Sequence, residues 1–178
     1  YSIALSIPNE QQTAYLTSIH AANVFTRENS VEQEYVSEIG IYLGSTQGVE
    51  VYLNSEDSDL TKTTLVASYT GANALEAGYH TLKLASPIKL TGDEFVVGIK
   101  YINSTGAQIP IECDLLECGF STTSNMYDTV VSEEEESYIS LDGETWSDMY
   151  NYSLLGYTLK NTNACIKAFT IIDENIST

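Results

Sequence analysis

The sequence predicts an all-β protein, an antiparallel β-sandwich or jelly roll with about eight or nine strands. Three observations predict it: short runs alternate apolar and polar residues, turn-forming residues separate these runs, and helical periodicity is nearly absent. The 13 tyrosines fit this class because tyrosine favours strands. A length of 178 residues suits one domain with its own core, so we expect residues 1–178 to form a single domain.

Alternation locates the strands of the first two thirds of the chain. Apolar residues occupy every second position from Ser37 to Leu43 and again from Val49 to Leu53, after a turn at residues 44–48. This pair predicts a β-hairpin. The other strands expected here are 15–26, 65–69, 78–84, 95–101 and 109–112.

The last third of the chain contains a second hairpin signal. Residues 138–141 and the pair Thr145-Trp146 flank Asp142-Gly143, and both central residues tolerate a positive φ. Residues 165–171 predict the final strand. Two polar segments, 54–61 and 118–136, are expected to be loops, and the second ends in four consecutive glutamates.

The charge excludes several classes of partner. A formal net charge of −18 comes from 25 acidic and 7 basic residues, and this field repels phosphate backbones and anionic lipid headgroups. We therefore expect no nucleic-acid partner. No apolar run reaches the roughly 18 residues of a membrane span, so no membrane insertion is expected. The chain begins at Tyr1 without a leader, which indicates a piece of a larger exported protein.

The cysteines do not indicate a disulfide framework or a zinc site. Their number, three, is odd, and Cys113 and Cys118 can either pair across four residues or remain thiols. The two histidines, His20 and His80, lie far from the cysteines in sequence, so zinc is not expected.

No catalytic residue is predicted. Cys165 with His80 is the one nucleophile–base pair worth testing, but Cys165 alternates with Lys167 and Phe169 as a buried strand residue does. The sequence contains no Gly-x-Ser-x-Gly elbow and no phosphate-binding glycine loop. A pair of carboxylates suited to glycoside hydrolysis is uninformative among 25 acids.

Five phrases of the sequence, in this order, resemble one family. Taken together they resemble the lectin-like domain found beside papain-like cysteine peptidases of Gram-positive bacteria and some archaea. The resemblance runs from about residue 15 to residue 170. It implies a lectin-like sandwich at the cell surface, without catalysis of its own and with an adjacent peptidase domain as partner. The phrases are His20–Thr26, Gly78–Leu84, Ile109–Glu112, Ser137–Asp148 and Ala164–Thr170.

The chain departs from this family in two places. Glu135-Glu136 stands where the family has Gly-Gln, and residues 150–161 form a longer insertion than we expect. Both departures lie beside the loops expected to face a ligand.

Aromatic and amide side chains in the C-terminal third predict a carbohydrate site. Flat rings stack on pyranose faces, while amides and carboxylates bond the hydroxyls. The alternative is that these tyrosines belong to strands and the core, and for Trp146 the core is favoured. The expected ligand-binding residues are Tyr127, Tyr138, Trp146, Asp148, Tyr150, Asn151 and Tyr152, with Asn125 and Tyr157 nearby in sequence.

Calcium is the one cofactor that the acidic residues suggest, although no motif requires it. Carboxylates and backbone carbonyls of loops are the ligands that calcium prefers. Acidic loops are more often simply solvated, and Asp142 is already explained by its turn. The expected ligands are Asp57, Asp59, Glu112, Asp142, Glu144 and Asp148.

Three functions follow from these observations. The first is a noncatalytic binding or adhesion module for carbohydrate or another cell-envelope component. The second is a structural spacer that packs on a neighbouring peptidase, and the third and least favoured is a hydrolase. An aromatic groove with a polar rim supports the first function, whereas an exposed apolar patch supports the second.

Overall fold

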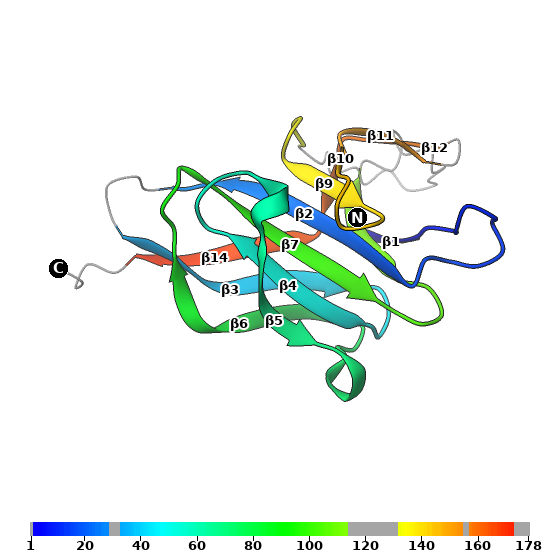
Figure 1. Cartoon of the computed structure of the whole chain (residues 1–178), viewed down its shortest axis with the longest axis horizontal. Helices are drawn as coiled ribbons and strands as arrows, with labels where there is room; N and C mark the ends of the chain where they lie inside the picture. The colour runs from blue at the N-terminus through cyan, green and yellow to red at the C-terminus, as the bar shows by residue number, and fades with distance from the viewer. Residues whose placement is uncertain (1, 29–32, 114–131, 155–156, 173–178) are drawn as a thin grey trace, which may run out of the picture.

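The chain folds into antiparallel β-sheets, which confirms the all-β sandwich prediction. The computed structural model describes residues 2–28, 33–113, 132–154 and 157–172 (Figure 1). Within these residues only two short 3-10 turns interrupt the strands, η1 (Leu60–Lys62) and η2 (Gly71–Asn73). The strands are β1 (Ser2–Ser6), β2 (Ser18–Thr26), β3 (Glu34–Leu43), β4 (Gly48–Asn54), β5 (Thr64–Tyr69), β6 (Gly78–Lys89), β7 (Glu94–Ile102), β8 (Gln108–Cys113), β9 (Ser137–Ser140), β10 (Ser147–Asp148), β11 (Asn151–Leu154), β12 (Tyr157–Lys160), β13 (Thr162–Ala164) and β14 (Ile166–Ile172).

Two sheets form the layers of the sandwich. The larger has the order β10-β9-β2-β7-β4-β5, and the smaller has the order β14-β3-β6. Their strands lie as two layers in Figure 1. Because side chains alternate across a strand, each strand sends one apolar set into the space between the sheets. Ile39 and Ile41 of β3 and Val97 and Ile99 of β7 are at most 1% exposed.

Two smaller sheets complete the described fold. Strands β1, β8 and β13 pair in the order β1-β8-β13. The insertion at residues 150–161 contains β11 and β12, which pair with Asn151 opposite Lys160. The described part of the insertion is therefore a two-stranded hairpin at the end of β10.

The predicted hairpin between residues 37–43 and 49–53 is wrong. Both segments are strands, but β3 pairs with β14 and β6 while β4 pairs with β5 and β7. The apolar faces of both strands enter the same core, with Leu43 and Val49 fully buried. The turn between them therefore crosses from one sheet to the other instead of joining neighbours.

Most other predicted strands are confirmed with small shifts. The strand predicted at 78–84 continues to Lys89, with a register irregularity opposite Val36 and Glu38. The hairpin around Asp142-Gly143 forms between β9 and β10, but Trp146 lies in the connection because β10 begins at Ser147. Strands β1, β11, β12 and β13 were not predicted.

Two segments were predicted to be loops, and the structure describes one of them in full. Residues 54–61 form a loop that ends in η1, as expected. Most of the loop predicted at 118–136 lies outside the described residues, as does Cys118, so its pairing with Cys113 stays a prediction. Over the part of the chain that the structure describes, no helix is long and apolar enough to cross a membrane.

Candidate functional site

A pocket of about 380 Å³ opens on the outer face of the six-stranded sheet. It lies between the loop that contains η1 and the connection from β9 to β10, segments about 80 residues apart in sequence. Its lining combines aromatic rings, hydroxyls and carboxylates. The lining residues are His20, Tyr52, Leu60, Thr61, Thr63, Gly98, Ile99, Asp142, Gly143, Glu144 and Trp146.

Gly98 and Tyr52 form the part of the pocket supplied by β7 and β4. They are register partners, and a Cβ on Gly98 would lie 3.5 Å from the Tyr52 Cβ, so the glycine leaves space beside the ring. The Tyr52 hydroxyl donates to Glu50 Oε2 at 2.9 Å. Burial and this hydrogen bond to Glu50 raise the pKa of Tyr52 to about 12, so the phenol stays protonated at neutral pH.

Trp146 forms a second aromatic wall. Its ring meets His20 edge to face, with ring centroids 6.3 Å apart and an interplanar angle of 83°. Its Nε1 atom is buried and has no hydrogen-bond partner within the described residues. An unsatisfied buried N–H costs about 1–3 kcal/mol, so an acceptor supplied to this atom would be stabilising.

A tight turn holds Trp146 in this position. Asp142 Oδ1 accepts hydrogen bonds from the backbone N–H groups of Glu144 at 2.8 Å and Thr145 at 2.7 Å. These bonds favour the carboxylate form and hold the pKa of Asp142 well below its usual range. Gly143 has φ = 83°, and a Cβ there would lie 2.9 Å from His20 Cε1. The turn therefore rests directly on the His20 ring.

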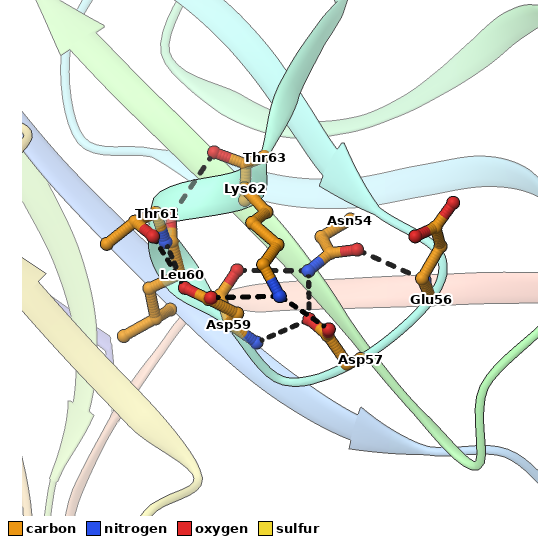
Figure 2. A network of polar contacts seen from close by, with 8 residues as sticks. All are labelled: Asn54, Glu56, Asp57, Asp59, Leu60, Thr61, Lys62 and Thr63. Carbon is orange, nitrogen blue, oxygen red and sulfur yellow. Dashed lines mark hydrogen bonds and ion pairs between the residues drawn. The ribbon is translucent and has the colours of Figure 1, made fainter.

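The opposite wall is fixed by the polar network of Figure 2. Lys62 Nζ lies 3.0 Å from Asp57 Oδ2 and 3.2 Å from Asp59 Oδ2. Asn54 Nδ2 donates to Asp57 Oδ1 at 2.6 Å, and the N–H of Thr61 donates to Asp59 Oδ1 at 3.0 Å. These contacts tie the loop into one arrangement, which places the side chains of η1 at the pocket.

The pocket presents hydrogen-bond acceptors and little positive charge. Burial first, and then the nearby Lys100, lower the pKa of His20, so its imidazole is neutral at pH 7. The cation of Lys100 is paired with Glu50 at 3.6 Å. Asp142 and the exposed Glu144 leave carboxylates at the rim. The site therefore suits a neutral ligand rich in hydroxyl donors.

Of the predicted ligand-binding residues that the structure describes, one lines the pocket. Trp146 lines the pocket, and Asp148 lies in register with Tyr138 on the neighbouring strand. The Asp148 carboxylate accepts from the N–H groups of Glu135 at 2.8 Å and Tyr150 at 2.9 Å, so it supports its own loop.

The remaining predicted residues are divided between core, surface and undescribed chain. Tyr152 packs against the hydrophobic core, and Asn151 is exposed at the start of β11. Tyr127 and Asn125 lie outside the described residues, and Tyr157 is placed only as a member of β12.

The six predicted calcium ligands are dispersed over the described structure. Asp57 and Asp59 share Lys62, Asp142 and Asp148 bond backbone N–H groups, and Glu144 lies at the pocket. Glu112 is on β8 opposite Asn163. Among the described residues, no three or more His, Cys, Asp or Glu side chains gather as a metal site would require. Calcium binding stays a prediction.

The chemistry of Cys165 disagrees with a nucleophilic role. The residue is buried, and burial together with Glu112 raises the thiol pKa to about 12. The thiolate is the reactive form, so this environment suppresses nucleophilicity. The His80 imidazole has a different partner: its Nε2 atom lies 2.7 Å from the backbone oxygen of Glu76, within hydrogen-bond distance.

Sequence reasoning missed four polar or aromatic pocket residues. They are His20, Tyr52, Thr61 and Thr63. Alternation indicates that His20 and Tyr52 point away from the core, because their neighbours Ile19, Val51 and Leu53 are buried. Which strands and loops adjoin them depends on sheet order, which alternation does not encode.

The fold and the pocket together define the class of protein. The chain is a β-sandwich with an aromatic, acceptor-rich pocket on one face, and burial raises the pKa of the Cys165 thiol to about 12. The model of the lectin-like domain family matches residues 8–170, so the chain belongs to the lectin-like domain family. No curated protein matches the sequence.

Two solved structures share the fold. The cysteine protease and lectin-like domains of Cwp84, a surface layer associated protein of Clostridium difficile, align with a TM-score of 0.67 at 19% identity over 88% of this chain and 32% of that one. A clostridial Cwp84 cysteine protease after propeptide cleavage aligns with a TM-score of 0.69 at 19% identity over 97% and 38%. This chain thus spans about a third of their length. The Cwp84 structure contains a cysteine protease domain and a lectin-like domain, and this chain is similar to the lectin-like one.

Proposed function

We propose that this domain binds a neutral carbohydrate of the cell envelope in the Trp146 pocket and thereby positions a linked cysteine peptidase near its substrate. The domain would then act outside the cell, as a binding or adhesion module. The observation that carries the proposal is the joint lining of one pocket by Trp146, Tyr52 and Glu144. Such a set offers ring faces for a pyranose and an acceptor for its hydroxyls.

Charge narrows the ligand to a neutral sugar. Asp142 and Glu144 oppose an anionic ligand, and His20 is neutral while Lys100 is already paired. A sugar hydroxyl can donate a hydrogen bond to the exposed Glu144 carboxylate, so it matches the acceptors of the lining. The role beside a peptidase is supported by the domain arrangement of Cwp84.

A screen of neutral oligosaccharides, peptidoglycan fragments and surface-polymer fragments tests the proposal. We expect saturable binding to at least one neutral glycan, and a loss of about tenfold or more for Trp146→Ala and Glu144→Gln. Tyr15→Ala is the matched aromatic control because Tyr15 is 53% exposed and does not line the pocket.

Two results would overturn this assignment. If neither pocket variant changes the affinity for the glycan, the glycan binds at another surface. Absence of binding to every glycan, with or without calcium, would favour the structural spacer, whose neighbour would be the adjacent peptidase domain.

A further inference from the structure

We infer that the outer face of the three-stranded sheet is a second binding surface, suited to an anionic polysaccharide that lies across strands β14, β3 and β6. This surface is separate from the Trp146 pocket, which lies on the other sheet. We call it the basic aromatic face. Its members are Tyr42, Tyr79, Lys83, Lys89, Lys167 and Phe169.

Three aromatic rings are exposed on this face. Tyr42 is 38% exposed, Tyr79 is 54% exposed and Phe169 is 40% exposed. Tyr42 and Tyr79 are register partners on β3 and β6, so their side chains leave the sheet on the same side. Large apolar side chains that gather on one outer face of a sheet mark an interaction surface.

Gly40 keeps the centre of the face low, because it has no side chain to push the neighbouring rings outward. A Cβ at Gly40 would collide with the Tyr79 hydroxyl and would lie 3.0 Å from Phe169 Cε2 and 3.3 Å from Lys167 Cβ. The Tyr79 and Phe169 side chains therefore lean over the backbone of the central strand from both neighbours. Gly40 is buried beneath them. The result is a low aromatic surface that spans three strands, or about 10 Å from β14 to β6.

Lysines surround these rings in an otherwise acidic molecule. Of the 7 basic residues of the chain, three lie on this face, Lys83, Lys89 and Lys167. Each is exposed, and within the described residues none forms an ion pair. Among the residues of this face that the structure describes, one acid, Glu38, lies in register with Lys83 and Phe169. The lysines still outnumber it.

The composition favours an anionic glycan over an acidic protein. Protein interfaces are depleted in lysine and are held by anchors that enter pockets, whereas this face is low in relief and rimmed by lysines. Stacked pyranose rings fit exposed aromatic side chains, and carboxylate or phosphate groups on the polymer complement the ammonium groups. The net charge of −18 repels such a polymer elsewhere, which favours this one orientation.

Titration calorimetry with polygalacturonate oligomers tests the inference, with the methyl-esterified oligomer as a probe of the same backbone without charge. We expect binding of polygalacturonate and weaker binding of the ester. Lys83→Gln/Lys167→Gln and Phe169→Ala should each raise Kd about tenfold. Lys160→Gln, a lysine on β12, and Trp146→Ala in the pocket should leave Kd unchanged.

Three outcomes would overturn the inference: no binding of polygalacturonate, equal binding of its ester, or Kd values insensitive to the lysine variants. Polyglutamate provides the arm for an acidic polypeptide. If polyglutamate binds as tightly as polygalacturonate and its Kd is unchanged by Phe169→Ala, the face recognises acidic protein instead. Melting curves of each variant establish that the fold is intact, so a lost interaction is not a lost structure.

Discussion

Ser137 Oγ donates a hydrogen bond to Asn23 Oδ1 at 2.7 Å in the buried interior, across 114 residues of sequence. The Asn23 amide in turn donates to the carbonyl oxygens of Ala164 at 3.1 Å and Ile166 at 3.2 Å. The N–H of Ala164 donates to Ser137 Oγ at 3.2 Å. This network joins β2 and β9 of the large sheet to β13 and β14. Three of the phrases that carry the family resemblance therefore meet at one buried structural clamp.

Removal of the clamp should destabilise the fold strongly. Asn23→Ala leaves two buried carbonyls and a hydroxyl without their partner, so we expect urea denaturation to show a loss of about 2–4 kcal/mol in the free energy of unfolding. Thr26→Ala, at the exposed end of the same strand, should change it by less than about 0.5 kcal/mol. Equal losses in both variants would contradict the role of the network.

Protonation of His20 should weaken the fold below neutral pH. Its pKa is lowered in the folded state, chiefly by burial, so the unfolded chain binds more protons as the pH falls through the ordinary value of 6.5. Stability should therefore be lost as the pH falls from 7 toward 5. His20→Gln should remove its share of that loss. If the free energy of unfolding changes with pH in the same way in the unsubstituted protein and in His20→Gln, His20 does not contribute to the pH dependence and the prediction is wrong.

The Cys165 thiol should react slowly in the native protein. Its pKa of about 12 leaves almost no thiolate at pH 8, and the side chain is buried. Mass spectrometry after iodoacetamide treatment should find Cys165 unmodified in native protein and modified after denaturation. Rapid native labelling at Cys165 would reopen the case for a nucleophile.

Calcium should not be needed to hold the loop of Figure 2. Lys62 already pairs with both Asp57 and Asp59, and the Asp142 carboxylate is held by backbone N–H groups. We expect the same melting temperature in EDTA and in millimolar calcium. A rise in melting temperature with calcium that disappears in Asp57→Asn or Asp142→Asn would instead establish a calcium site at that residue.

Local sequence patterns predicted strands better than their partners. Alternation identified β3, β4 and β7 and their buried faces, because one side of each strand is chosen by the core. Alternation could not show that the turn after Leu43 changes sheets, since a hairpin and a crossover bury the same residues. The error at β3 and β4 has this origin.

The candidate site was only partly predictable for the same reason. Trp146 and the Asp142-Gly143 turn are adjacent in sequence, so their proximity follows from local geometry. His20, Tyr52 and Thr61 come from three other elements, and only the order β9-β2-β7-β4 brings them to the same pocket. Among the tyrosines clustered near the C-terminus in sequence, Tyr152 packs against the core instead of lining the pocket.

The central claim is that a neutral carbohydrate occupies the pocket at Trp146, and the emission of this tryptophan tests it most directly. Trp146 is the one tryptophan of the chain, so every change in indole fluorescence reports on that wall of the pocket. We predict a saturable shift in intensity or wavelength when the neutral glycan that binds best is titrated, lost in Glu144→Gln and retained in Tyr15→Ala. A glycan that binds by calorimetry without changing Trp146 emission would contradict the claim.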